Sequence, residues 1–188
     1  MELVKEVTMP MEIKTEELLK TITPQLIMGL IPCLNERFLN IAWNVIKSYV
    51  EELANRTNGE YGIYDIWQNL WNGKCNLHMA YMNNSGKATP ENTGDLFVEH
   101  LVNPKKDFVG YVITRLDAQS VHVWQVVIMP EYQNTNAFKL GYQYLENYLK
   151  NIGTPYITFS TQREGWHKTC IDLGFIETYT VYRKQLKV

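Results

Sequence analysis

Hydrophobic residues recur at helical spacing in two stretches of the first half of the chain. The first stripe consists of Phe38, Ala42, Val45, Tyr49 and Leu53. Steps of three or four residues place these side chains on one face, which predicts an amphipathic helix over 37–55. The second stripe consists of Ile63, Ile66, Trp67, Leu70 and Trp71. It predicts a shorter helix that ends at Gly73, because glycine is the usual residue after a helix C-terminus.

Alternating and β-branched residues predict strands in the middle of the chain. The predicted strands cover 75–82, 96–102, 108–115 and 120–129. The last two are separated only by residues 116–119, which predicts a β-hairpin. The polar stretch from Asn83 to Gly94 contains Pro90 and two glycines, and this composition is typical of a loop.

Pro130 stops the last of these strands, and the pattern then changes. Capping residues at 134–136 predict a helix that runs to about Lys150 and ends at Gly153. A short strand is predicted over 156–160, and after it a helix that ends at Gly174. Residues 175–186 predict a final strand. The second half therefore reads strand, helix, strand, helix, strand.

The first 34 residues fit this pattern least well. Glu16 and Glu17 suggest a short helix over 15–21, and Pro24 and Pro32 interrupt the segment after that helix. The apolar run over 26–31 is far shorter than the roughly 20 residues that span a bilayer, and the acidic start is untypical of a secretory signal. We predict an N-terminal extension or docking segment at 1–34 and one domain at 35–188.

Composition narrows the function classes. The formal net charge is −2 and the isoelectric point about 6.1, which argues against a general nucleic-acid binder. The three cysteines are far apart, which predicts reduced thiols in a cytoplasmic protein. The four histidines lack the spacing of metal ligands, so no metal site is predicted.

Three features of 121–175 together resemble a known family. They are Pro130-Glu-Tyr-Gln133 at a strand-to-helix junction, Leu173-Gly-Phe175 at the end of a later helix, and the strand between them. This order resembles the second half of the GCN5-related N-acetyltransferase (GNAT) fold, and the match covers roughly 60–188. The resemblance implies an α/β (α+β) fold with a central mixed, mostly antiparallel sheet flanked by helices.

The resemblance also implies a coenzyme A site on the central strand and on the loop after it. The positions that correspond to this site are Val126, Val127, Ile128, Gln133, Asn134, Thr135, Asn136, Ala137 and Phe138. In the family, backbone amides of a glycine-rich loop hold the pyrophosphate. Here Asn136 and Phe138 replace the two glycines. Asn136 tolerates a left-handed backbone, whereas the ring of Phe138 either blocks the pyrophosphate or turns into the core, and Phe138→Gly is expected to strengthen cofactor binding in the first case.

The residues that move protons are less clearly marked. Many family members carry a tyrosine proton donor where this chain has Cys170, which lies at helical spacing from Trp166 and Leu173 and is either a thiol donor or a core residue. Tyr179 or Tyr182 is an alternative donor. On the central strand, His122 is a candidate base, with a reference pKa of about 6.5, or a structural histidine. Simple alternation places it on the opposite face from Gln125.

The resemblance leads to two candidate functions. The first is an acyl-coenzyme A-dependent N-acyltransferase, with acetyl-coenzyme A as cofactor and an unidentified primary amine as acceptor. The second is a catalytically inactive GNAT-like protein that binds protein partners or forms a homo-oligomer. The altered glycine loop resembles that of GNAT-like proteins of tailed bacteriophages, so a virion component in the host cytoplasm or the virion belongs to this alternative.

Overall fold

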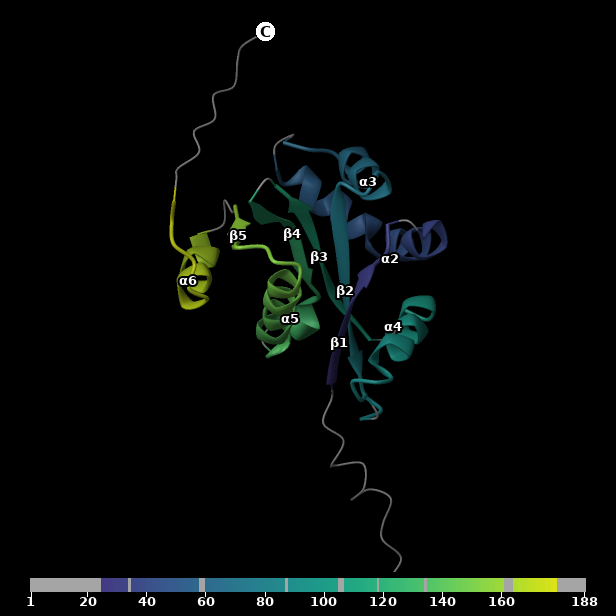
Figure 1. Ribbon diagram of the computed structural model, residues 1–188. Coiled ribbons are helices and arrows are strands. Elements are labelled where there is room, and N and C mark those ends of the chain that lie inside the picture. The colour runs from purple at the N-terminus through teal and green to yellow at the C-terminus, as the bar shows by residue number, and fades with distance from the viewer. Residues whose placement is uncertain are drawn as a thin grey trace, which may run out of the picture. The chain divides into compact units, whose positions relative to one another are not determined.

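A five-stranded sheet with the order β1-β2-β3-β4-β5 organises the fold (Figure 1). The computed structural model describes residues 25–178, except 34, 58, 59, 87, 105, 106, 118, 134 and 161–163. The strands are β1 (Gln25–Ile31), β2 (Cys75–Asn83), β3 (Phe108–Leu116), β4 (Ser120–Ile128) and β5 (Tyr156–Phe159). The chain divides into two compact units between Thr158 and Phe159.

The pairs β1–β2, β2–β3 and β3–β4 are all antiparallel. β1 pairs with β2 along its whole length, from Gln25 opposite Asn83 to Ile31 opposite Leu77. The apolar run at 26–31, predicted to lie in the N-terminal extension, is therefore part of the sheet, and the boundary predicted at residue 34 falls after the first strand. Residues 1–24, with the helix predicted at 15–21, lie outside the described residues.

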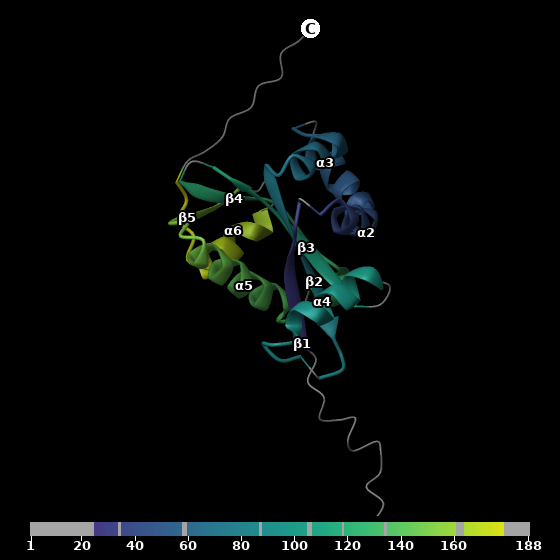
Figure 2. The same ribbon diagram turned by 45° about the vertical axis from the view of Figure 1, so that its right-hand side comes forward.

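Helices cover both faces of the sheet (Figure 2). One face meets α2 (Glu36–Asn55), α3 (Ile63–Trp71) and α4 (Thr93–Val102), and the other meets α5 (Ala137–Asn151). Side chains cap the starts of α2 and α3: the Asn35 side chain accepts a hydrogen bond from the Phe38 amide at 3.2 Å, and the Asp65 carboxylate accepts one from the Gly62 amide at 2.7 Å. The predicted helices at 37–55 and 63–71 are thus confirmed.

The buried stripe of α2 is rotated from the predicted one. The buried positions are Leu39, Ala42, Ile46, Val50 and Ala54. Only Ala42 belongs to the predicted stripe, and its other members are half-buried at the margins of the core. α2 carries apolar residues over a wide arc, so its sequence allows both stripes. The packing against α3, α4 and β1 selects the one centred on Ile46.

The strand predicted over 96–102 was wrong, because this segment lies in helix α4. Phe97 and Leu101 are buried four residues apart, which is the spacing of one helix face. The ring of Phe97 packs against Gly29 of β1, where any side chain would collide with it. This contact fixes α4 against the edge of the sheet.

Helix α5 closes a smaller core on the opposite face. Ala137, Leu145 and Leu149 of α5 are buried, and Ala137 clusters with Ala80 and Val109 of the sheet. The predicted end at Gly153 is confirmed, with a left-handed φ of 74° at that glycine.

The second unit begins at Phe159 and contains α6 (Glu164–Asp172). The rings of Phe159 and Trp166 pack with their centroids 5.1 Å apart. The described part of the predicted last strand, residues 175–178, has no regular structure, and 179–188 lie outside the described residues. In the part of the chain that the structure describes, every helix is too short or too polar to cross a membrane.

Candidate functional site

Strand β4 has two different edges. Nine residues long, it is paired with β3 from Val121 to Ile128, whereas its other neighbour, β5, has only four residues. A hydrogen bond of 3.0 Å between His122 Nδ1 and Thr158 Oγ1 places β5 beside the first half of β4. Among the described residues, the edge from Gln125 to Ile128 therefore faces no strand.

Backbone direction can be assigned along this open edge. The amide of Met129 donates to the carbonyl of Val109 in the β3 segment at 2.9 Å. Since successive residues of a strand point to alternate sides, the N–H and C=O of Val127 also point to β3, while those of Val126 and Ile128 point to the open edge. The Gln133 side chain donates to the Ile128 carbonyl at 3.0 Å, which agrees with this assignment.

The loop after β4 uses much of its own hydrogen-bonding capacity. η1 (Pro130–Tyr132) opens the loop, and the Gln133 and Thr135 amides donate to the carbonyls of Pro130 and Tyr132 at 3.3 and 3.2 Å. The Ala137 amide donates to the Thr135 hydroxyl at 3.1 Å. Three of the amides predicted to hold a pyrophosphate are thus engaged within the loop.

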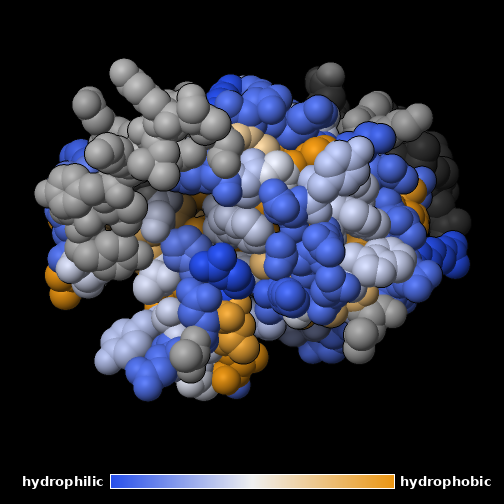
Figure 3. Space-filling model, turned by 90° about the horizontal axis from the view of Figure 1, so that it is seen from above, coloured by the Kyte–Doolittle hydropathy of each residue, from blue (hydrophilic) through white to orange (hydrophobic). Residues whose placement is uncertain are grey.

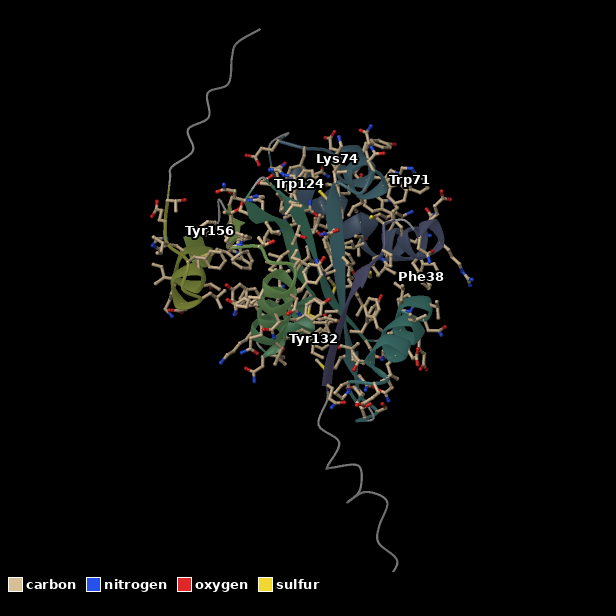
Figure 4. All side chains as sticks on the ribbon, in the orientation of Figure 1. Phe38, Trp71, Lys74, Trp124, Tyr132 and Tyr156 are labelled. Atoms are coloured by element: carbon tan, nitrogen blue, oxygen red, sulfur yellow. The ribbon has the colours of Figure 1, made fainter. Side chains whose placement is uncertain are left out.

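The two positions that replace glycine in this loop are accommodated differently. Asn136 precedes α5 with a φ of −71°, so no left-handed backbone is required there. Phe138 is half-buried in the first turn of α5, and its predicted effect on a pyrophosphate stays a prediction. Asn134 lies outside the described residues. Figure 4 labels Trp124, in the middle of β4, and Tyr132, in the loop after that strand.

A β-bulge interrupts β4 at Trp124. Ile113 of β3 lies opposite Gln125, but the next residue, Thr114, lies opposite Val123, so Trp124 has no partner. His122 lies opposite Arg115, two residues from Ile113, and residues two apart on a strand share a face. His122 and Gln125 therefore lie on the same face. The prediction of opposite faces was wrong because the bulge shifts the alternation by one residue.

Three polar side chains form a chain of hydrogen bonds on this face. The Tyr111 hydroxyl donates to Gln125 Oε1 at 3.1 Å, and Gln125 Nε2 donates to the Tyr61 hydroxyl oxygen, also at 3.1 Å. Gln125 and Tyr111 are each 1% exposed, whereas Tyr61, from the segment before α3, is half-buried. Burial raises the pKa of Tyr61, and the hydrogen bond from Gln125 opposes this shift.

Aromatic and charged groups surround the open end of this network. The rings of Tyr61 and Trp124 meet edge to face at 5.3 Å. The Arg115 guanidinium lies 5.6 Å from the centre of the Trp124 ring, on its face, and donates to Asp117 at 3.1 Å. Sequence reasoning missed Tyr61 and Tyr111, because no local pattern links residues that lie 64 and 14 positions from Gln125.

The predicted acid–base residues fall in both units. Burial, together with the positive charge of Arg115, lowers the pKa of His122, so its imidazole is neutral at pH 7. Cys170 is half-buried in α6, and burial raises the pKa of its thiol. Tyr179 and Tyr182 lie outside the described residues. The roles of His122, Cys170 and Tyr179 stay predictions. In the described ranges, no three His, Cys, Asp or Glu side chains are grouped as metal ligands would be.

No family model matches the sequence, and no curated protein matches it. Solved structures do match the fold. AAC(6')-Iy, solved in complex with the bisubstrate analogue CoA-S-monomethyl-acetylneamine, superimposes with a TM-score of 0.53 at 13% identity. The match covers 86% of this chain and 99% of that one.

Two further structures agree. A ribosomal-protein-alanine N-acetyltransferase from Brucella melitensis has a TM-score of 0.55 at 11% identity, and a putative acetyltransferase from Pyrococcus furiosus has a TM-score of 0.55 at 10% identity. Each match covers 87% of this chain and 100% of the other. At such identities the likeness establishes the fold alone: the chain has the GNAT-like α/β fold, a five-stranded sheet flanked by helices.

Proposed function

We propose that this protein is an acyl-coenzyme A-dependent N-acyltransferase that transfers an acetyl group to a primary amine. The observation that carries the proposal is the open edge of β4 from Gln125 to Ile128, opposite a β5 that is too short to cover it. Unpaired backbone groups at a strand edge bind an extended, amide-containing chain in the way a further strand would. The pantetheine arm of coenzyme A is such a chain.

Each part of the site would have its own task. Acyl-coenzyme A supplies the activated acyl group as a thioester. The Val126 amide and carbonyl and the Ile128 amide would bind along the pantetheine arm, and the N-terminus of α5 would favour the anionic phosphates. On the face that carries Gln125, neutral His122 would accept the proton that the amine loses, with Thr158 fixing its ring through Nδ1.

The engaged loop amides favour the second candidate, a GNAT-like protein without catalysis. To bind a pyrophosphate, the loop would have to give up the internal hydrogen bonds of the Gln133, Thr135 and Ala137 amides. This cost lowers the affinity of the loop for the nucleotide part of the cofactor. A structural or interaction role is therefore kept as the alternative. The bacteriophage virion role belongs to it and stays a prediction, since none of the three matched structures named above is identified as a phage protein.

Calorimetric titration with acetyl-coenzyme A tests the proposal. We expect micromolar binding by the wild type and about fivefold weaker binding by Val126→Pro, which removes one edge amide that is not part of the β3 ladder. Val126→Ala keeps that amide and is the matched control, with unchanged affinity. No binding up to millimolar cofactor would favour the non-catalytic alternative.

A second titration separates the contribution of the β4 edge to cofactor affinity from that of the loop after β4. S-acetylpantetheine lacks the pyrophosphate and the nucleotide. If the loop amides keep their internal hydrogen bonds, they donate none to the pyrophosphate. A single hydrogen bond to a charged group strengthens binding about tenfold or more. Without such bonds, S-acetylpantetheine should bind within about tenfold of acetyl-coenzyme A. A difference of several hundredfold would mean that the loop opens and holds the pyrophosphate.

A further inference from the structure

The hydrogen bonds of Gln125 fix the direction of the Tyr61 hydroxyl. An amide side chain can lie in two orientations related by a flip. In the orientation with Oε1 toward Tyr111, the Tyr111 proton is satisfied, and Nε2 donates to the Tyr61 oxygen. The Tyr61 oxygen then accepts from inside the protein, so its own proton must point away from Gln125.

The burial of the two tyrosines decides between the orientations. With the amide flipped, Nε2 would face Tyr111, whose hydroxyl would then accept and leave its proton without an acceptor. Tyr111 is 1% exposed, so that unsatisfied donor would be costly. Tyr61 is half-buried and can give its proton to a group outside the core. The arrangement with the Tyr61 proton outward is therefore favoured.

The outward hydroxyl lies beside the part of β4 where the open edge begins. Gln125 is the first residue of that edge, and its side chain carries the network on the face that also holds His122. Trp124 forms an aromatic wall against Tyr61 at 5.3 Å. Seen from the end where α3 lies, hydrophilic residues make up much of the described surface, and groups of hydrophobic residues lie between them (Figure 3).

We propose that Tyr61 selects the amine acceptor by donating a hydrogen bond to an oxygen atom of that molecule, and that Gln125 and Tyr111 are positioning residues that keep the Tyr61 proton pointing outward. The acceptor class is thus a primary amine that carries a hydrogen-bond-accepting oxygen near its amino group. This inference rests on the proposed acyltransferase function. It adds substrate selectivity to the proposed function, because a hydroxyl held as a hydrogen-bond donor discriminates against amines that lack the oxygen atom.

Two isosteric amines test the proposal. 2-Methoxyethylamine has an ether oxygen that only accepts hydrogen bonds, and n-butylamine has a methylene group in its place. Acetyl-coenzyme A is the donor and thiol release is the readout. Because the ether oxygen of 2-methoxyethylamine makes its amino group less basic, kcat/KM is calculated on the concentration of the unprotonated amine. On that basis we expect kcat/KM of the wild type to be about fivefold higher for 2-methoxyethylamine, which is the value of one neutral hydrogen bond. Tyr61→Phe should turn over the two amines at nearly equal kcat/KM.

Further variants separate the effect of the Tyr61 hydroxyl orientation from a general effect of removing a tyrosine hydroxyl. Tyr111→Phe lets the Gln125 amide flip, so it should reduce the preference to between those of the wild type and Tyr61→Phe. Tyr64→Phe is the control: it changes a tyrosine of α3 that is 83% exposed and should leave the ratio of kcat/KM for the two amines unchanged. The calorimetric affinity of Tyr61→Phe for acetyl-coenzyme A should equal that of the wild type.

The outcomes distinguish this inference from the proposed function. A wild type that does not bind acetyl-coenzyme A refutes the proposed function, and this inference with it. A wild type that binds the cofactor but shows no preference between the amines, or turns over neither, overturns only the role of Tyr61. So does a preference that persists in Tyr61→Phe.

Discussion

Buried polar side chains on the two faces of β2, β3 and β4 differ in their hydrogen bonding. On the face toward α2 and α3, Tyr111, Gln125 and Tyr61 form a continuous network. On the face toward α5, His78 is fully buried, and neither of its ring nitrogens has a hydrogen-bond partner among the described residues. The same holds for the Thr114 hydroxyl on that face. Asn83 Nδ2, at the end of β2, is also buried without a partner among the described residues, so the contrast is between the Gln125 network and the surroundings of His78 and Thr114.

The difference lies in what each face receives from outside the sheet. On the first face, the Tyr61 hydroxyl accepts a hydrogen bond from Gln125 Nε2. The second receives the rings of Tyr144 and Tyr148, whose centroids lie 6.0 and 4.9 Å from that of His78 in edge-to-face contacts. Burial lowers the pKa of His78 to about 4. A polar residue is thus either part of a recognition network or a cost to stability, depending on its partners.

The largest expected effect is acid lability caused by His78. Its pKa of about 4 in the folded protein lies below the unfolded value of about 6.5, so the unfolded state binds the proton more tightly. The contribution of His78 to stability is complete above pH 6.5 and is lost as the pH falls through 4. Between pH 7 and pH 4 this group alone should lower the free energy of unfolding by about 3 kcal/mol, as measured by urea denaturation.

His78→Phe isolates that effect from the titration of carboxylates. Phenylalanine keeps a ring between Tyr144 and Tyr148 but cannot be protonated. The variant should lose about 3 kcal/mol less than the wild type over the same pH range. Parallel pH profiles for the two proteins would mean that His78 has a partner or solvent access in solution.

The next effect concerns the satisfied face. Tyr111→Phe removes the donor to Gln125 Oε1. One buried polar atom of the Gln125 amide is then unpaired: Oε1 in the present orientation, or Nε2 if the amide flips. We expect the free energy of unfolding to fall by about 2 kcal/mol at pH 7, the cost of an unsatisfied buried polar group. A change below the error of the denaturation experiment would show that the network carries no stability.

The smallest effect should have the opposite sign. Thr114→Val replaces the buried hydroxyl, which is without a partner among the described residues, by a methyl group of similar size. We expect unchanged stability or a gain of up to about 1 kcal/mol in urea denaturation, because no hydrogen bond is lost. A loss of more than about 1 kcal/mol would contradict the contrast between the faces.

Sequence patterns were sufficient where local spacing decides the structure. Periodicity and the residues that start or end elements explain the helices at 37–55 and 63–71, the hairpin of β3 and β4, and the order helix, strand, helix between Pro130 and Gly174. The patterns failed at 96–102, where Phe97 and Leu101 fit a helix, but the short apolar segment also fits a strand. Spacing cannot separate the two in so short a segment, and packing against Gly29 decides.

The candidate site was predicted only in outline. The sequence indicated the strand and the loop after it, and the cofactor contacts of these residues stay predictions. In the structure, Val126 and Ile128 present backbone groups to the open edge. The chemistry of the neighbouring face was not predictable, because Tyr61 and Gln125 are brought together only by the fold. Nor does the sequence mark Trp124 as a bulge, which places His122 and Gln125 on one face.

By itself, the sequence determined most of the helices and strands and their order, with the exceptions of β1 and α4, since these elements depend on neighbours a few positions apart. Only the tertiary structure decided which face of α2 is buried, where the alternation of β4 shifts, how far β5 covers β4 and which way the Tyr61 hydroxyl points. Each of these depends on contacts between distant segments. Their energies are settled by burial and pairing in three dimensions and not by the spacing of residues along the chain.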